Sequence, residues 1–170
     1  SGNVLMENFR EAGAPDFDSD DHALAEKIQR TFSEEIMQEA VSAVEDQHGE
    51  NAAAEMEGKV LADAVFPINP LKTVMPGSTD VGDVSYQAPT GQILTACKAF
   101  GTPGHSWQEV SQSGSSIGIK GMITAAKVMG MSAIDVFQDP RIAEEAKKEF
   151  LKAVKGGYHC PIPDEIKPDL

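Results

Sequence analysis

The stretch Gln92-Ile-Leu-Thr-Ala-Cys-Lys-Ala-Phe100, which runs directly into Gly101-Thr-Pro-Gly-His-Ser-Trp-Gln108, decides the predicted fold. Its first nine residues are mostly apolar and lie between segments containing Gly and Pro, a pattern typical of a β-strand. A second, shorter strand is predicted at Leu71-Lys-Thr-Val-Met75. Together with the helices predicted around them, these strands favour the α/β class. So few strands make a thin sheet for 170 residues, and we therefore expect part of a larger α/β domain to be missing.

Four helices are predicted from capping residues and apolar spacing. Gly13 ends the first helix and Asp139, followed by Pro140, begins the last, which Gly156-Gly157 ends. Between them, apolar residues recur every three or four positions, as on one face of an amphipathic helix. The predicted helices cover residues 4–12, 19 to about 44, 115 or 116 onward, and 141–154.

The third predicted helix carries a wide apolar face that we expect to pack against the sheet. This face consists of Ile119, Met122, Ile123, Ala126, Met129 and Ala133. Residues 45–59 are by contrast acidic and lack apolar periodicity, which predicts a mobile loop with a helical turn at Asn51 to Met56. The tail Tyr158 to Pro163 is predicted to be extended.

Composition excludes several classes of protein. A formal charge of -13 over 170 residues repels nucleic acid, and no apolar run reaches the roughly 18 residues of a membrane span. We therefore expect a single domain, residues 1–170, with neither nucleic acid nor a membrane as partner. Cys97 and Cys160 are too far apart to form a CxxC motif, which favours a reducing, cytoplasmic location.

Polar residues follow both predicted strands, where sites form in open α/β sheets. Ser78, Thr79, Asp80 and Asp83 offer hydroxyl and carboxylate groups that either contact a ligand or stabilise a turn locally, and spacing alone favours the turn. We predict that this loop converges with the loop carrying His105 on one crevice. Pro103 and Gly104 fix the backbone before His105, which suits a metal ligand or proton carrier. One imidazole cannot by itself hold a divalent ion, so residue spacing leaves the role of His105 open.

Four motifs taken together resemble the M20 metallopeptidase and amidohydrolase family over residues 3–168. They are Gly77 to Ser85, Gly101 to Gln108, Lys120-Gly-Met122 and Tyr158 to Pro163. The resemblance implies that this chain is the carboxyl-terminal half of a zinc-peptidase-like α/β/α catalytic domain, without its upstream half and its lid domain.

The same resemblance implies a site and a reaction. His105 matches the last ligand of a pair of divalent ions, Zn or Mn, and Ser78, Thr79, Asp80 and Asp83 match positions that contact substrate or support the ligands. The general-base Glu and the other ligands would lie upstream, so this segment would hold no catalytic residue and bind no metal tightly. The substrate would be an N-acyl amino acid or a dipeptide-like molecule, with p-aminobenzoyl-glutamate as the leading candidate. The partners implied are a second copy of the chain and a second hydrolase subunit.

Two functions thus follow from the sequence. The chain is part of a metal-dependent amidohydrolase and inactive alone, or it is a non-catalytic binding or assembly module, because it lacks a base and most ligands.

Overall fold

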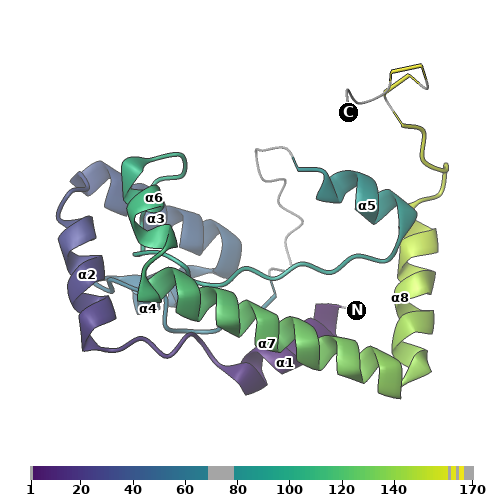
Figure 1. Cartoon of the computed structure of the whole chain (residues 1–170), viewed down its shortest axis with the longest axis horizontal. Coiled ribbons are helices and arrows are strands. Elements are labelled where there is room, and N and C mark those ends of the chain that lie inside the picture. The colour runs from purple at the N-terminus through teal and green to yellow at the C-terminus, as the bar shows by residue number, and fades with distance from the viewer. Residues whose placement is uncertain (1, 69–78, 161, 164, 167–170) are drawn as a thin grey trace.

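Helices form all the regular secondary structure that the structure describes. The computed structural model describes residues 2–68, 79–160, 162–163 and 165–166 (Figure 1). Within these residues it contains no strand, so the prediction of an α/β fold with about four helices is wrong. The predicted strand Leu71–Met75 lies outside the described residues. The helices are α1 (Gly2–Ala12), α2 (Ser19–Gln29), α3 (Glu34–His48), α4 (Glu50–Met56), α5 (Val81–Gln87), α6 (Trp107–Ser113), α7 (Ser116–Gln138) and α8 (Pro140–Ala153).

The segment 92–100 is extended but is not a β-strand. Its backbone groups bond to side chains and to one isolated carbonyl, and not to a neighbouring strand. The amide of Ala99 donates to the side-chain oxygen of Gln112 at 2.6 Å, and the amide of Phe100 donates to the carbonyl of Val60 at 2.8 Å. The carbonyl of Phe100 accepts from the Gln29 amide at 2.9 Å. A β-sheet needs a repeating ladder of hydrogen bonds between two backbones. Here side chains satisfy backbone groups that such a ladder would otherwise pair.

The first helix ends as predicted, but the second is two helices. Gly13 has φ 74° and its amide donates to the carbonyl of Phe9, as expected of a glycine that ends a helix. The predicted helix 19–44 breaks between α2 and α3, where the hydroxyl of Thr31 donates to the carbonyl of Ile28 and Ser33 caps α3 by accepting from the amide of Ile36. The apolar periodicity concealed this capping signal.

The predicted acidic loop 45–59 is largely helical. α3 continues to His48, and α4 follows after Gly49, which has φ 90°. The predicted helical turn at residues 51–56 is therefore confirmed. Ala52, Ala53 and Met56 are buried in α4, which packs on α3. Small apolar side chains thus stabilise this segment despite its acidic composition.

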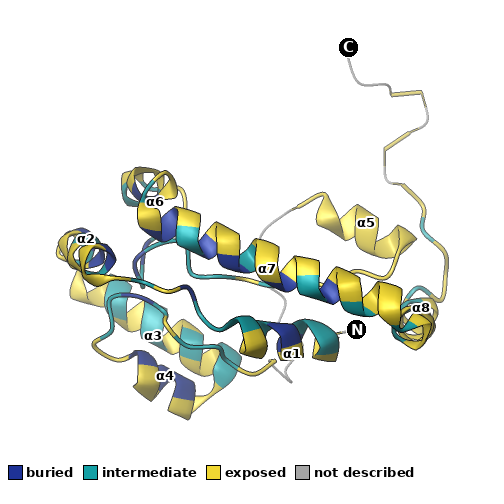
Figure 2. Ribbon diagram, turned by 60° about the horizontal axis from the view of Figure 1, so that its bottom comes forward, coloured by how far each residue is buried: buried dark blue, intermediate teal, exposed yellow. Residues whose placement is uncertain are grey.

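The longest helix, α7, crosses the molecule and joins α6 at one end to α8 at the other (Figures 1 and 2). Its predicted start is confirmed, with Ser115 at the N-cap, and so is that of α8, where Asp139 accepts from the amide of Arg141. By length and composition α7 could cross a membrane, but a third of its most apolar window is buried inside the molecule. Core helices of water-soluble proteins meet the same criteria, so the absence of a membrane partner stays a prediction.

The prediction of which face of α7 is buried is wrong. Ile119, Met122, Ile123 and Met129 are exposed. The residues that α7 buries are two apolar residues, Ile117 and Val128, and four small or polar ones, Gly118, Gly121, Thr124 and Ser132. This buried face packs on α1, with which α7 lies side by side (Figure 2). The main core lies at the start of α7, where it joins α2 and the extended segments through Ala25, Ile28, Leu61, Ala99 and Ile117.

Candidate functional site around His105

The loop that carries His105 is attached to the core through one buried amide side chain. Gln112 in α6 is fully buried, accepts from the amide of Ala99, and donates to the hydroxyl of Thr102 at 3.2 Å and to the carbonyl of Gln108 at 3.0 Å. Thr102 in turn donates to the carbonyl of Ala99 at 2.7 Å. A buried polar group without a hydrogen-bond partner destabilises the fold. This network therefore holds the turn 99–102 in one conformation.

Gly101 allows this turn to sit close to α3. Its φ is 83°, and a Cβ at this position would lie 2.8 Å from the sulfur of Met37. A larger residue would therefore strain the backbone and displace Met37. Pro103 then fixes the chain direction, and its carbonyl accepts from the hydroxyl of Ser106 at 2.7 Å.

His105 itself has a left-handed backbone, with φ 55°. Its amide donates to one carboxylate oxygen of Glu109 at 2.8 Å, and the ammonium of Lys98 donates to the other oxygen. The Lys98 ammonium, followed by the His105 amide, lowers the pKa of the Glu109 carboxyl from its usual value. Ser106 caps α6 by accepting from the amide of Glu109 at 3.2 Å. The backbone around His105 is thus closely held, while its side chain is exposed to solvent.

The described residues do not complete a metal site. Among them, no three His, Cys, Asp or Glu side chains are grouped closely enough to hold an ion. His105 is available as one nitrogen ligand, but protein sites for divalent ions need three or four ligands. Next to the Lys98–Glu109 pair lies a hollow of about 300 Å³, also lined by Cys97, Ser113 and Met122. His105 does not line this hollow itself; its backbone amide is bonded to Glu109, which does.

The second predicted loop lies elsewhere. Ser78 is outside the described residues, and the hydroxyl of Thr79 accepts from the amide of Val81 at 3.3 Å, a local turn contact. Asp80 is exposed at the start of α5 and makes no side-chain cap bond. Figures 1 and 2 both place α5 well apart from α6, so among the described residues the two predicted loops do not meet in one crevice.

Asp83 contacts the carboxyl-terminal tail. Its carboxylate accepts from the hydroxyl of Tyr158, whose ring stacks on that of Tyr86 with centroids 5.3 Å apart. This hydrogen bond to the carboxylate raises the pKa of Tyr158 well above its usual value. In this arrangement Asp83 joins α5 to the tail.

Lys120, in the motif Lys120-Gly-Met122, has a structural contact. Its ammonium donates to Asp21 at 2.5 Å and to Asp18 at 2.7 Å, and Ser116 also donates to Asp21. Burial alone would raise the pKa of Asp21, but these contacts and the bond from the Asp18 amide lower it to about 2. The motif therefore connects the start of α7 to the start of α2.

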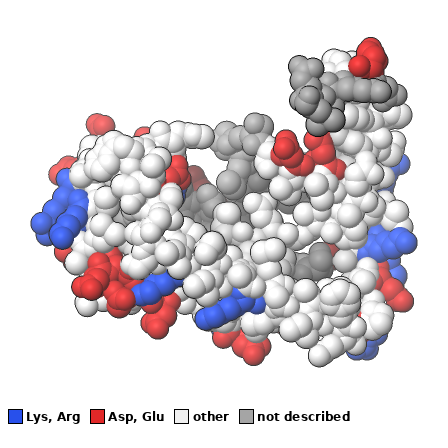
Figure 3. All heavy atoms as spheres, viewed as in Figure 1, with Lys and Arg blue, Asp and Glu red and all other residues white. Residues whose placement is uncertain are grey.

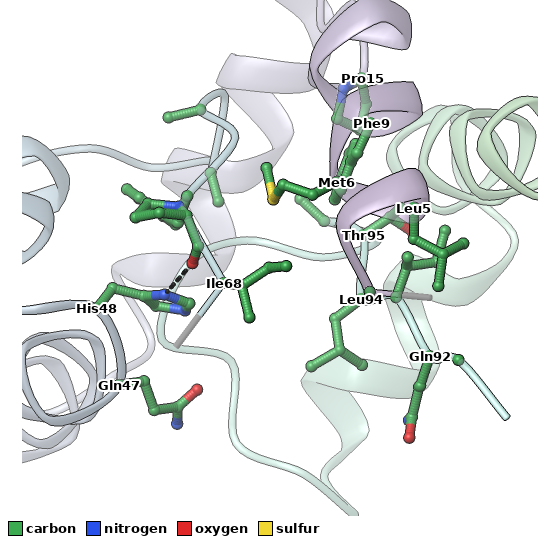
Figure 4. Close-up of a pocket in the computed structure, with 18 of the residues that line it drawn as sticks. Leu5, Met6, Phe9, Pro15, Gln47, His48, Ile68, Gln92, Leu94 and Thr95 are labelled. Carbon is green, nitrogen blue, oxygen red and sulfur yellow. Dashed lines mark hydrogen bonds between the residues drawn. The ribbon is translucent and has the colours of Figure 1, made fainter. Parts of the chain in front are cut away.

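A larger cavity lies away from His105. About 730 Å³ in volume and open to solvent, it is lined by α1, the end of α3 and the segments 62–68 and 90–96 (Figure 4). Its one ionisable side chain, His48, stacks on Phe66 and has Nδ1 3.2 Å from the carbonyl of Pro67. With mostly apolar walls and its imidazole already engaged, this cavity offers less chemistry than the His105 loop.

Charge does not single out a binding face in the view of Figure 3. Acidic and basic side chains are interspersed near the edges of that face, and uncharged residues occupy its centre. The exclusion of nucleic acid stays a prediction from the net charge.

Sequence reasoning missed three residues around His105, namely Lys98, Glu109 and Gln112. The spacing Ser106-x-x-Glu109 is that of a capping box and begins one residue after His105. It could have identified Glu109 as a group that contacts the loop. Lys98 and Gln112 have no comparable signal, because their contacts depend on how the extended segment crosses α6.

The chain is similar to part of a bacterial hydrolase. That relative is a p-aminobenzoyl-glutamate hydrolase subunit from Escherichia coli (strain K12), which is 36% identical over 170 residues. The match covers 98% of this chain and 35% of the relative, so the chain spans about a third of the length of that curated relative. No protein-family model and no solved structure matches the chain.

Proposed function

We propose that this chain is part of a metal-dependent hydrolase of the M20 kind that cleaves the amide bond of an N-acyl amino acid or of p-aminobenzoyl-glutamate. The observation that carries the proposal is the 36% identity along 98% of the chain, which includes the His105 loop. The relative is named for hydrolysis of p-aminobenzoyl-glutamate, which has an amide bond between an aromatic acid and an amino acid.

In this proposal His105 contributes one imidazole to the active site. Its exposed side chain on a firmly held backbone suits a group that must meet a ligand at a fixed position. Because the described residues form no metal cluster, the other ligands and the general base would have to come from residues other than those described. Thr79, Asp80 and Asp83 remain candidates for substrate contact, at a distance from His105 in this structure.

The test is hydrolysis by the complete protein that carries this chain. His105→Gln is compared with His22→Gln, a histidine in α2 outside the loop, on p-aminobenzoyl-glutamate and a panel of N-acyl amino acids. We expect His105→Gln to lower kcat/KM by at least roughly 100-fold, beyond the loss usual for residues that only support a ligand. Bound metal should fall in parallel. Equal activity and equal metal content in both variants would show that His105 is not part of the active site.

A second candidate function is a non-catalytic binding or assembly module, acting as a homo-oligomer or with a second subunit. It is favoured by the exposed apolar residues of α7, among them Met122 and Phe137. This function predicts a complete protein without hydrolytic activity whose sedimentation coefficient rises with concentration. Active hydrolysis, lost with His105→Gln, would decide for the enzyme.

A further inference from the structure

The backbone of His105 is unusual among the described residues. It is the one residue other than glycine that they place at positive φ, at 55°. In this region the Cβ of an L-residue crowds the backbone, so a side-chain-bearing residue stays there only when its surroundings fix it. The neighbouring Gly104, which could adopt the conformation without strain, has an ordinary φ. The left-handed residue is thus the histidine, although a glycine stands beside it.

One carboxylate fixes this conformation. Oε2 of Glu109 accepts from the amide of His105 at 2.8 Å, while Oε1 accepts from the ammonium of Lys98. In a capping box the carboxylate at this position would instead accept from the amide of the N-cap residue, here Ser106. Glu109 reaches one residue further back, to His105. Its bond therefore acts on the histidine rather than on the helix end.

Lys98 connects the carboxylate of Glu109 to the core of the molecule. The residues after it are tied to separate elements, Ala99 to Gln112 of α6 and Phe100 to the carbonyl of Val60. The side chains of Lys98 and Glu109 are both about a third exposed, so solvent screens their attraction only in part. A continuous set of contacts thus runs from the extended segment, through Lys98 and Glu109, to the backbone of His105.

We infer that Glu109, held by Lys98, is a positioning residue that keeps His105 in its left-handed conformation and so sets the direction in which the imidazole leaves the backbone. This inference rests on the proposed function for its effect on catalysis. For its structural content it rests on the contacts above. Glu109 itself touches neither substrate nor reacting atoms.

The first test is amide hydrogen exchange of this chain by NMR. Glu109→Ala removes the acceptor of the His105 amide, whereas Glu145→Ala removes the acid of an exposed Lys–Glu pair in α8 and serves as the matched control. We expect the His105 amide to exchange at least about 10-fold faster in Glu109→Ala, and the imidazole signals of His105 to shift. Both should be unchanged in Glu145→Ala, and so should the amides of α1 and α7 in either variant.

The second test separates positioning from helix capping in the complete protein. Positioning predicts that Glu109→Ala lowers kcat by roughly 10- to 100-fold with KM nearly unchanged, as for residues that orient a ligand. Glu109→Gln, which keeps an acceptor for the His105 amide, should recover much of kcat and of the exchange protection. Lys98→Met should give an intermediate loss. If Glu109→Ala unfolds the chain, Glu109→Gln and Lys98→Met carry the test.

Two results would overturn the inference. One is an unchanged exchange rate of the His105 amide in the Glu109 and Lys98 variants. The other is faster exchange with unchanged imidazole signals and unchanged kcat, which would mean that Glu109 holds the backbone of His105 without setting the direction of its imidazole. A complete protein that hydrolyses no amide refutes the proposed function instead, and the NMR measurements still decide whether Glu109 sets the conformation of His105.

Discussion

The two faces of α7 differ in the size of their side chains as well as in their burial. The face that packs on α1 and the segment 92–100 buries Ile117 and Val128, but its other buried residues are small or polar, among them Gly118, Gly121 and Ser132. The opposite face carries large apolar side chains in solvent, with Met122 60% and Phe137 86% exposed. At Gly118 and Gly121 burial on α7 therefore follows how closely another backbone approaches, and apolar size alone does not predict which face is buried.

Polar contacts specify the buried face as much as packing does. Asn8 of α1 is buried and donates to the hydroxyl of Ser132 at 3.1 Å and to the carboxylate of Asp135 at 2.6 Å. On the same side the hydroxyl of Thr95 donates to the carbonyl of Gly121 at 3.0 Å. Each of these bonds needs one particular register between α7 and its neighbour, which apolar contact alone would not fix.

The largest change in the free energy of unfolding should come from adding a side chain at Gly121, where α7 lies close to the segment 92–100. A Cβ there would lie 2.2 Å from the carbonyl oxygen of Ala96 and 2.6 Å from the sulfur of Cys97. Since a backbone carbonyl cannot swing aside, Gly121→Ala should lower the free energy of unfolding by about 3 kcal/mol, the upper end for overpacking. Urea denaturation measures it.

Gly130→Ala is the matched control on the same helix, because a Cβ at Gly130 meets no atom within 4 Å. It should raise the free energy of unfolding by about 0.5–1 kcal/mol through helix propensity. Equal effects of the two substitutions would mean that α7 does not touch the segment 92–100 in solution.

A smaller effect is expected from the buried carboxylate of Asp21 in α2, which accepts from Ser116 and Lys120 of α7. The pKa of Asp21 is about 2 in the folded chain, against 3.8 as its ordinary value. A lowered folded pKa stabilises the fold above the unfolded pKa, and this stability is lost as pH falls from about 4 to about 2. The loss should be about 2 kcal/mol.

Asp21→Asn should flatten this acid limb of the stability curve, whereas Asp20→Asn, an exposed neighbour in the same turn, should leave it intact. Denaturation followed between pH 5 and 2 compares them. An acid limb of full size in Asp21→Asn would show that Lys120 does not hold this carboxylate.

The smallest effect is expected on the exposed face. Met122→Gln should change the free energy of unfolding by no more than about 0.5 kcal/mol, because its side chain already meets water. The same change at Val128, which is fully buried, should lower it by more than about 2 kcal/mol. Thermal unfolding at low protein concentration measures both. A loss above about 1 kcal/mol for Met122→Gln would contradict its exposure.

Local signals predicted helix ends well and failed where contacts are distant. Gly13 and Asp139 act as the sequence predicts, since caps depend on neighbouring residues only, and Ser115 stands at the N-cap of α7 although its side chain makes no cap bond. The segment 92–100 has the composition of a strand, yet Gln29 and Gln112 bond its backbone. Neither glutamine could be paired with it from spacing.

The site was predictable to a similar extent. The turn-forming residues around His105 identified a constrained loop, and the structure confirms that its backbone is held. The apolar stripe of α7, however, predicted its exposed face, because periodicity alone does not tell which side another backbone approaches. Glycines 118 and 121, three residues apart, were the readable sign of close approach.

Gln29 has a consequence for the order in which the chain can fold. Its side-chain amide donates to two carbonyls, that of Lys59, 30 residues later, and that of Phe100, 71 residues later. During synthesis from the amino terminus, α2 can form early, but this amide has its second partner only after the ribosome has released Phe100. The contact that joins α2 to both later segments is therefore complete only once Phe100 has been made, directly before the His105 loop.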